Sequence, residues 1–289
     1  MLHLRLLVLA AFTSLTVFAA AADLPIPDGV TFTRDVEFSN ADGQHLQVNI
    51  AEPKGAGPFP AVVCIHGGGF RAGKRESYDK LCLTLAQRGY VAITVTYRLA
   101  PAYPFPAAVI DCKAAVRWLR ANAAKYHVDA KRIGATGGSA GGHLVQFLGV
   151  TEGVRDFEAG EHLGESSAVQ CVVNFYGPSD LTKSYGASVD AAEVLPLFFG
   201  GDLSTKRREH IVGSPLYWAT PKAAPTLIVH GTDDKYVAYE QAGWMVDRLK
   251  ACMVEVELLT LPGAGHGFKG PDAEKAEAAL LAWFDRHLK

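Results

Sequence analysis

Apolar and polar residues alternate along the first part of the chain. Residues 44–51 are apolar at Leu46, Val48 and Ile50, and a segment with similar alternation, 31–39, precedes them. Alternation with a period of two predicts strands that are buried on one face only. The intervening Asn40-Ala41-Asp42-Gly43 consists largely of turn-forming residues, so we expect a β-hairpin here.

Farther along, short continuous apolar runs replace the alternation. Such runs predict strands buried on both faces, and we expect these at 61–65, 91–97, 132–136, 168–175, 225–230 and 254–261. Between them lie segments compatible with helices, which we expect at 78–88, 106–125, 142–148, 238–250 and 271–288. This order predicts an α/β fold with a mostly parallel central sheet, helices on both faces and antiparallel opening strands.

A glycine-rich motif follows the strand expected at 132–136. Gly137-Gly138-Ser139-Ala140-Gly141 reads G-x-S-x-G and stands between that strand and a helix. A serine on a sharp strand-to-helix turn requires small neighbours, and the turn presents its hydroxyl above the sheet edge near a helix N-terminus. Ser139 is therefore predicted to be a nucleophile. The alternative is an ordinary glycine-rich turn.

A nucleophilic serine requires a base and an acid that orients the base. His266 lies in the glycine-rich segment after the last expected strand, which places it at the carboxyl edge of the sheet. Two candidate acids, Asp233 and Asp234, follow the strand at 225–230, and the residues alone do not decide which of them reaches His266. The chain order serine, aspartate, histidine is that of the α/β-hydrolase fold.

Backbone N–H groups that could hold a negatively charged oxygen are expected at two places. Ala140 follows the serine, and His66-Gly67-Gly68-Gly69-Phe70 follows the buried strand at 61–65. Fixed N–H donors stabilise the oxyanion of acyl transfer with little reorganisation. The glycine loop therefore belongs to the same predicted site as Ser139.

Five motifs, in this order along the chain, resemble those of the hormone-sensitive-lipase-like esterases, and most closely their bacterial feruloyl-esterase-like and acetyl-esterase-like branch. They are His66-Gly67-Gly68-Gly69-Phe70, Tyr97-Arg98-Leu99-Ala100-Pro101, Gly138-Ser139-Ala140-Gly141-Gly142-His143-Leu144, His230-Gly231-Thr232-Asp233-Asp234 and Gly265-His266-Gly267-Phe268. The resemblance covers the chain from about Val36 onward. It implies an α/β-hydrolase fold with Ser139 as nucleophile, Asp234 as acid, His266 as base, and N–H donors at Gly68, Gly69 and Ala140.

Gly138 departs from the lipase-like members of that family, which usually carry aspartate directly before the serine. The departure favours the feruloyl-esterase-like branch. An irregular stretch at about 181–215 is expected to form a small cap within a single domain of residues 23–289. Aromatic residues are expected to line the substrate pocket, although such residues serve as often in core packing: Phe70, Tyr176, Phe198 and Phe268.

The first residues read as a secretory signal peptide, 1–22, with an apolar core at 6–18 and small residues at 19–22. We therefore expect an exported protein, periplasmic or extracellular, without stable membrane insertion. The net charge of −2 is close to balanced and no basic stripe is visible, so nucleic acid is not an expected partner.

No Cys, His or carboxylate cluster has the spacing of a metal site, and neither a metal nor another cofactor is expected. Because the cysteines number five, at least one thiol stays unpaired, and their spacing supports no disulfide framework. They are Cys64, Cys82, Cys112, Cys171 and Cys252.

The predicted function is hydrolysis of short-chain or aromatic carboxylic esters through an acyl-enzyme on Ser139. The expected substrate is a small-molecule or polysaccharide-linked ester. Two alternatives stay open: cleavage of an amide or peptide bond by the same residues, and a catalytically silent hydrolase fold that binds a ligand. The natural substrate, the oligomeric state and the pairing of the cysteines are not determined by the sequence.

Overall fold

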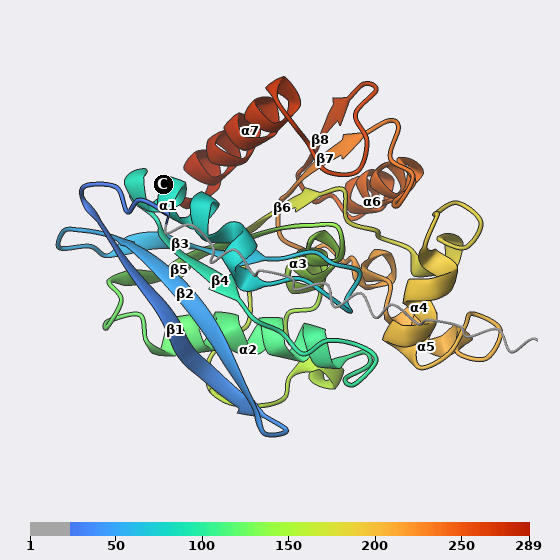
Figure 1. The fold of residues 1–289 in the computed structure, drawn as a ribbon, viewed down its shortest axis with the longest axis horizontal. Coiled ribbons are helices and arrows are strands. Elements are labelled where there is room, and N and C mark those ends of the chain that lie inside the picture. Colours follow the sequence, from blue (N-terminus) through green and yellow to red (C-terminus); the bar gives the residue numbers. More distant parts are fainter. Residues whose placement is uncertain (1–23) are drawn as a thin grey trace, which may run out of the picture.

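The computed structural model describes residues 24–289, so the predicted signal peptide, residues 1–22, lies outside the described part of the chain. Eight strands of the described part form one sheet (Figure 1). In spatial order they are β1 (Val30–Ala41), β2 (Gln44–Pro53), β4 (Val91–Val95), β3 (Phe59–Ile65), β5 (Val128–Gly138), β6 (Cys171–Phe175), β7 (Thr226–Gly231) and β8 (Val256–Leu261). β1 pairs antiparallel with β2, and β2 with β4, whereas all later pairings are parallel. The predicted sheet is confirmed.

Alternate residues of the central strands face two different hydrophobic cores. In β3, Ala61, Val63 and Ile65 belong to one core, whereas Val62 and Cys64 belong to the other. Successive side chains of a strand point to opposite faces, so a strand covered on both sides has to be apolar at every position. The continuous apolar runs of the sequence have this physical origin.

Helices cover both faces of the sheet (Figure 1). α1 (Asp79–Gln87) and α7 (Pro271–Leu288) pack in the core on one face. The other face is covered by α2 (Ala107–Ala121), α3 (Ala140–Val150) and α6 (Glu240–Ala251). Among residues 24–289, no helix is both long and apolar enough to span a membrane.

Several helices differ from their predicted bounds by a few residues. The helix expected to start at Tyr78 is preceded by a 3-10 turn, Arg75–Tyr78, and becomes α-helical at Asp79. The helix expected at 106–125 ends earlier, at Ala121. There the Asn122 side-chain amide donates to the Trp118 carbonyl at 2.9 Å, which satisfies one of the carbonyls left free at a helix end.

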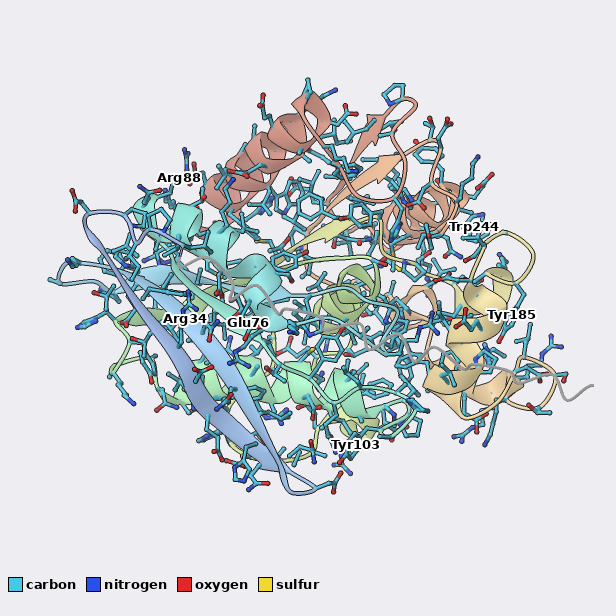
Figure 2. The ribbon with its side chains drawn as sticks, in the orientation of Figure 1. Arg34, Glu76, Arg88, Tyr103, Tyr185 and Trp244 are labelled. Carbon is cyan, nitrogen blue, oxygen red and sulfur yellow. The ribbon has the colours of Figure 1, made fainter. Side chains whose placement is uncertain are left out.

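Between β6 and β7 the chain leaves the sheet, in the stretch that contains the predicted cap. This stretch carries α4 (Ala191–Phe199) and α5 (Arg207–Val212), at the right of Figure 1, together with 3-10 turns at Leu181–Lys183 and Pro215–Trp218. The hydroxyl of Tyr185, labelled in Figure 2, lies 2.9 Å from Nε2 of His210 in α5. The Phe105 N–H donates to the Phe198 carbonyl at 2.7 Å and so ties α4 to the loop before α2.

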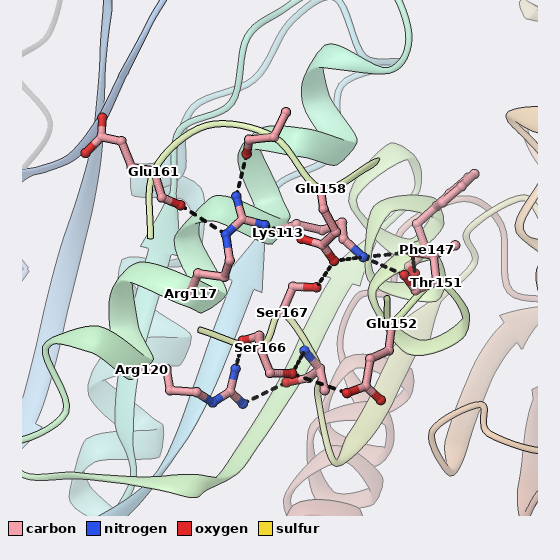
Figure 3. A network of polar contacts seen from close by, with 12 residues as sticks. Lys113, Arg117, Arg120, Phe147, Thr151, Glu152, Glu158, Glu161, Ser166 and Ser167 are labelled. Atoms are coloured by element: carbon pink, nitrogen blue, oxygen red, sulfur yellow. Dashed lines mark hydrogen bonds and ion pairs between the residues drawn. The ribbon is translucent and has the colours of Figure 1, made fainter. Parts of the chain in front are cut away.

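A buried ionic network fixes the loop that follows α3 (Figure 3). Nζ of Lys113 lies 2.9 Å from one carboxylate oxygen of Glu158, and Arg117 pairs with the other oxygen. Both cationic side chains are fully buried, and burial lowers the pKa of Lys113 although Glu158 opposes this. Lys113 also donates to the Thr151 carbonyl at 2.7 Å, at the end of α3. One carboxylate therefore compensates two buried cations, which makes Glu158 a critical residue for stability.

Candidate active site

The predicted site residues all follow strand ends at one edge of the sheet. Ser139 comes directly after β5, and the glycine loop after β3. Asp234 and His266 follow β7 and β8, which run parallel to the other two strands. Carboxyl ends of parallel strands meet at the same edge, so residues far apart in the chain come together there.

Ser139 sits in a strained turn. Its φ of 57° and ψ of −123° are rare for a residue with a side chain, and its N–H donates to the Phe175 carbonyl of β6 at 2.9 Å. A Cβ on Gly137 would lie 2.6 Å from the Gly141 carbonyl, and one on Gly141 would lie 2.1 Å from the Ile65 carbonyl oxygen. Only glycine allows this close approach of β5, α3 and β3, which explains the G-x-S-x-G pattern.

A continuous line of hydrogen-bond contacts joins three of the predicted residues. Nε2 of His266 lies 2.9 Å from Oγ of Ser139, and Nδ1 lies 2.8 Å from Oδ2 of Asp234. In the tautomer that satisfies both contacts, Nδ1–H donates to the carboxylate and Nε2 accepts from the serine hydroxyl. The His266 side chain is 20% exposed and that of Asp234 fully buried, so the line runs from the surface of the cleft inward.

Asp234 is held in its ionised form. Burial alone would raise the pKa of its carboxyl, but hydrogen bonds from His230, His266 and the Val237 N–H bring that pKa well below its ordinary range. Oδ1 accepts from the N–H groups of Tyr236 and Val237, both at 2.9 Å. Asp233, the other candidate, is exposed, and its N–H donates to the Ala264 carbonyl at 2.9 Å. The structure therefore brings Asp234, and not Asp233, to His266.

The glycine loop turns its backbone toward Ser139. Gly68 has a φ of 116°, and a Cβ there would lie 2.1 Å from the Ala72 carbonyl oxygen. A Cβ on Gly67 would lie 2.8 Å from the Gly138 carbonyl oxygen, so the loop packs directly on the serine turn. Ala140 is the first residue of α3, where N–H groups have no partner within the helix. The predicted donors at Gly68, Gly69 and Ala140 thus lie around the serine.

Three other histidines near the site contact neighbouring residues of the fold through their rings. The His66 ring stacks on Tyr97 with centroids 4.3 Å apart, and its Nδ1 lies 2.7 Å from the Gly67 carbonyl oxygen. His143 is fully buried and Nε2 lies 2.7 Å from the Gly213 carbonyl oxygen, which links α3 to the end of α5. His230, at the end of β7, lies next to the acid: its Nε2 is 3.3 Å from Oδ2 of Asp234.

Two cavities have Ser139 in their wall. The smaller one, about 70 Å³, is apolar for most of its wall and is lined by Gly69, Phe70, Ser139, Ala140, Pro178, Leu181, Ser184, Ser188, Asp190, Ala191, Val194, Leu195, Tyr236 and Val237. The larger one, about 450 Å³, is an open cleft lined by Gly67, Gly68, Gly69, Arg71, Ala72, Tyr78, Gly138, Ser139, Tyr176, Asp190, Tyr236 and His266. Only the larger cleft includes His266 in its wall.

The four aromatic residues predicted to line the pocket lie in different places. Phe70 lines the smaller cavity and Tyr176 the larger cleft. Phe198 lines neither: it is 1% exposed and stacks behind Phe70 with centroids 3.9 Å apart, because it points into the core beneath α4. Phe268 lines a separate hollow with Tyr176 and residues of α7, since its ring packs edge-on against Tyr176.

Of the residues that line the cavities and were not predicted, Tyr236 is the one whose ring lies beside the histidine. Tyr236 lines both cavities, and its ring centroid lies 5.1 Å from that of His266. Its place two residues after Asp234, on the loop that presents the acid, is the signal that could have identified it. The five cysteines are all buried and free, and within residues 24–289 no group of three His, Cys, Asp or Glu side chains could hold a metal ion.

A serine in a strained turn, a histidine and a buried carboxylate at the carboxyl edge of such a sheet define an α/β hydrolase, as the sequence motifs predicted. Within that class, the chain belongs to the BD-FAE family, whose pattern matches residues 48–249. The resemblance noted in the sequence is therefore confirmed.

Individual relatives agree with this assignment. Esterase LipC of Mycobacterium tuberculosis is 32% identical over 81% of this chain, which spans 59% of LipC. A truncated carbohydrate esterase from gut microbiota superimposes with a TM-score of 0.80 at 25% identity, over 89% of this chain and 96% of that one. Esterase Est2 of Thermogutta terrifontis, with propionate bound, superimposes with a TM-score of 0.74 at 28% identity, over 90% and 94%. The chain spans little more than half the length of the curated relatives LipC and LipM.

Proposed function

We propose that this protein hydrolyses carboxylic esters through an acyl-enzyme on Ser139. The observation that carries the proposal is the line of contacts from the Ser139 hydroxyl through His266 to the Asp234 carboxylate, at 2.9 and 2.8 Å. His266 accepts the serine proton as the oxygen attacks the ester carbonyl, and Asp234 stabilises the imidazolium that forms. His266 returns the proton to the leaving alcohol, and the same residues then activate the water that hydrolyses the acyl-enzyme.

The negative charge of the tetrahedral intermediates falls on the former carbonyl oxygen. Gly68, Gly69 and Ala140 line the two cavities beside Ser139, and their N–H groups would donate to that oxygen. The N-terminus of α3 adds a positive dipole end at the same place. No metal or other cofactor enters this mechanism.

The position of His266 assigns the two cavities to the two parts of the ester. His266 must reach the oxygen of the leaving alcohol to protonate it, so the alcohol lies on the side of the open cleft, whose wall includes His266. The acyl group then occupies the smaller cavity, whose wall includes Ser139 but not His266.

The small acyl cavity favours a short acyl group over an aromatic one. A cavity needs roughly 10–15 Å³ to hold one water molecule, and this cavity has a volume of about 70 Å³. A chain of a few carbons fits this space, and a feruloyl group exceeds it. The propionate bound to the related Est2 agrees with an acyl group of this size.

The open cleft would accept a large alcohol. Its volume is about 450 Å³, and three tyrosines, Tyr78, Tyr176 and Tyr236, are among its lining residues. Such surfaces suit a sugar, which presents C–H groups and hydroxyls together. The relative described as a carbohydrate esterase and the predicted export of this chain support an acetylated polysaccharide or oligosaccharide as substrate.

Replacement of the nucleophile tests the proposal. We expect Ser139→Ala to abolish hydrolysis of p-nitrophenyl acetate while leaving the thermal unfolding midpoint close to that of the parent. A fluorophosphonate should label the parent on the peptide that contains Ser139 and leave the variant unlabelled. Full activity of a folded Ser139→Ala protein would refute the proposed function.

The two alternatives make different predictions for the same protein. Amide cleavage would appear as hydrolysis of acyl anilides at rates near those of the matched esters. A silent binding fold would react neither with esters nor with the fluorophosphonate. We expect ester hydrolysis to exceed anilide hydrolysis by more than tenfold, because an amine leaves less readily than an alcohol.

A further inference from the structure

Tyr176 occupies the space that a side chain before the nucleophile would fill. It follows β6 directly, and its ring lies over Gly138. A Cβ on Gly138 would lie 3.0 Å from the Tyr176 hydroxyl oxygen and 3.2 Å from two ring carbons. These distances are tighter than ordinary carbon contacts, so a side chain at position 138 requires the ring to shift by a few tenths of an ångström.

The same tyrosine ring contacts His266. The two centroids are 4.8 Å apart and the planes are inclined at 62°, which is an edge-to-face arrangement. The Tyr176 ring also packs edge-to-face against the Phe268 ring, with the two ring centroids 4.9 Å apart. Because Phe268 and Gly138 confine the Tyr176 ring, the ring forms a fixed wall against the imidazole.

The backbone of Tyr176 is held in a costly conformation. Its φ is 41°, in the left-handed region, and its N–H donates to the Val229 carbonyl of β7 at 2.9 Å. A non-glycine residue in this region is energetically unfavourable and persists where the surroundings determine its place.

We propose that Tyr176 is a positioning residue for His266, and that glycine at position 138 is required because it admits the tyrosine ring. This inference rests on the proposed function, in which His266 is the base. The ring limits rotation of the imidazole and keeps Nε2 at 2.9 Å from Ser139 Oγ. A base displaced by about 1 Å loses on the order of a hundredfold in rate.

Removal of the ring should therefore slow every step that uses His266. We expect Tyr176→Ala to lower kcat for p-nitrophenyl acetate by about 10- to 100-fold, with KM within about threefold of the parent. Tyr176→Phe, which keeps the ring and removes only the hydroxyl, should recover most of the lost kcat. If Tyr176→Ala does not fold, Tyr176→Leu keeps most of the volume without the ring and replaces it in the comparison.

Deacylation separates positioning from contact with the leaving group. Tyr176 also lines the open cleft, so a mere contact with the alcohol would affect only acylation. In deacylation the alcohol has gone and His266 activates water. We expect Tyr176→Ala to slow decay of the acetyl-enzyme, measured by stopped-flow after the burst of p-nitrophenol, by a factor similar to its effect on acylation. A deacylation rate equal to that of the parent would overturn the inference.

A double-mutant cycle tests the link to position 138. Gly138→Ala alone should lower kcat because its methyl group displaces the Tyr176 ring. In the Tyr176→Ala background the same substitution has space and should change kcat by less than about twofold, so the two effects are not additive. Additive effects would show that Gly138 acts independently of Tyr176.

These experiments distinguish failure of the positioning role of Tyr176 from failure of the proposed ester hydrolysis. If the parent hydrolyses no ester, or folded Ser139→Ala stays active, the proposed function is refuted. If the parent is active and Ser139→Ala is not, but Tyr176→Ala keeps the kcat and deacylation rate of the parent, only the positioning role is refuted.

Discussion

His230 Nε2 lies 3.3 Å from Oδ2 of Asp234, the oxygen that also lies 2.8 Å from Nδ1 of His266. Two imidazoles thus lie at one oxygen of the carboxylate, and two backbone N–H groups bind its other oxygen. Four hydrogen-bonding groups keep a buried carboxylate ionised and fixed in orientation, as an acid that orients a catalytic histidine has to be.

The adjacent aspartates offer a matched comparison. We expect Asp234→Asn to lower kcat for p-nitrophenyl acetate by roughly 10⁴-fold, because an amide leaves His266 in the wrong tautomer. Asp233→Asn alters the neighbouring, exposed carboxylate and should leave kcat within about threefold of the parent. Comparable losses in both variants would contradict the assignment of Asp234 as the acid.

The acyl cavity should limit chain length. Val194 of α4 lines that cavity, and its methyl groups lie 3.4 Å from the position of a Cβ on Gly69. We expect the parent to prefer short esters, from acetate through butyrate, over octanoate. Val194→Ala should raise kcat/KM for hexanoate and octanoate relative to acetate by about tenfold, which corresponds to space for one or two methylene groups.

Val189 provides the control for this measurement. It lies on the same segment but is 66% exposed and lines neither cavity, so Val189→Ala should leave the chain-length profile of p-nitrophenyl esters unchanged. An unchanged profile in Val194→Ala would show that the acyl group does not enter the small cavity.

The buried network predicts a stability effect distant from the chemistry. Glu158→Gln leaves Lys113 and Arg117 buried without a counter-charge and should lower the free energy of unfolding by about 3–5 kcal/mol, measured in urea. Glu161→Gln is the control, because Arg117 contacts the backbone carbonyl of Glu161 and not its side chain. The idea fails if both variants unfold at the same urea concentration.

His143 should make stability depend on pH. Burial lowers the pKa of this histidine from 6.5 to about 4, despite its hydrogen bond to the Gly213 carbonyl. The unfolded chain takes up a proton near pH 6.5 and the folded chain only near pH 4. The contribution of His143 to the free energy of unfolding is therefore fully present above pH 6.5 and is lost as the pH falls toward 4.

His143→Gln removes this titration. Between pH 7 and pH 5 the parent should lose about 2 kcal/mol more unfolding free energy than the variant, as measured by urea unfolding at the two pH values. The other histidines are present in both proteins and cancel in the comparison. Equal losses would mean that His143 is already protonated, or exposed, in the folded chain.

Local patterns along the chain predicted the scaffold because they act over a few residues. Apolar runs correspond to β3 and its neighbours, and the glycines around Ser139 correspond to backbone contacts that tolerate no side chain. Strand order then placed the serine, the acid loop and His266 at one edge of the sheet. The sequence by itself therefore determined the α/β architecture and which loops meet at the site.

The tertiary structure decided which side chains within those loops face one another. Asp233 and Asp234 differ by one position, and the family resemblance favoured Asp234, but only the backbone path of the loop turns that carboxylate to a histidine 32 residues farther along the chain. Phe198 points into the core instead of the cavity for the same kind of reason. Gly138 ends β5, whereas the Tyr176 ring that lies over it follows β6. Such relations depend on packing between segments distant in sequence, which no local pattern encodes.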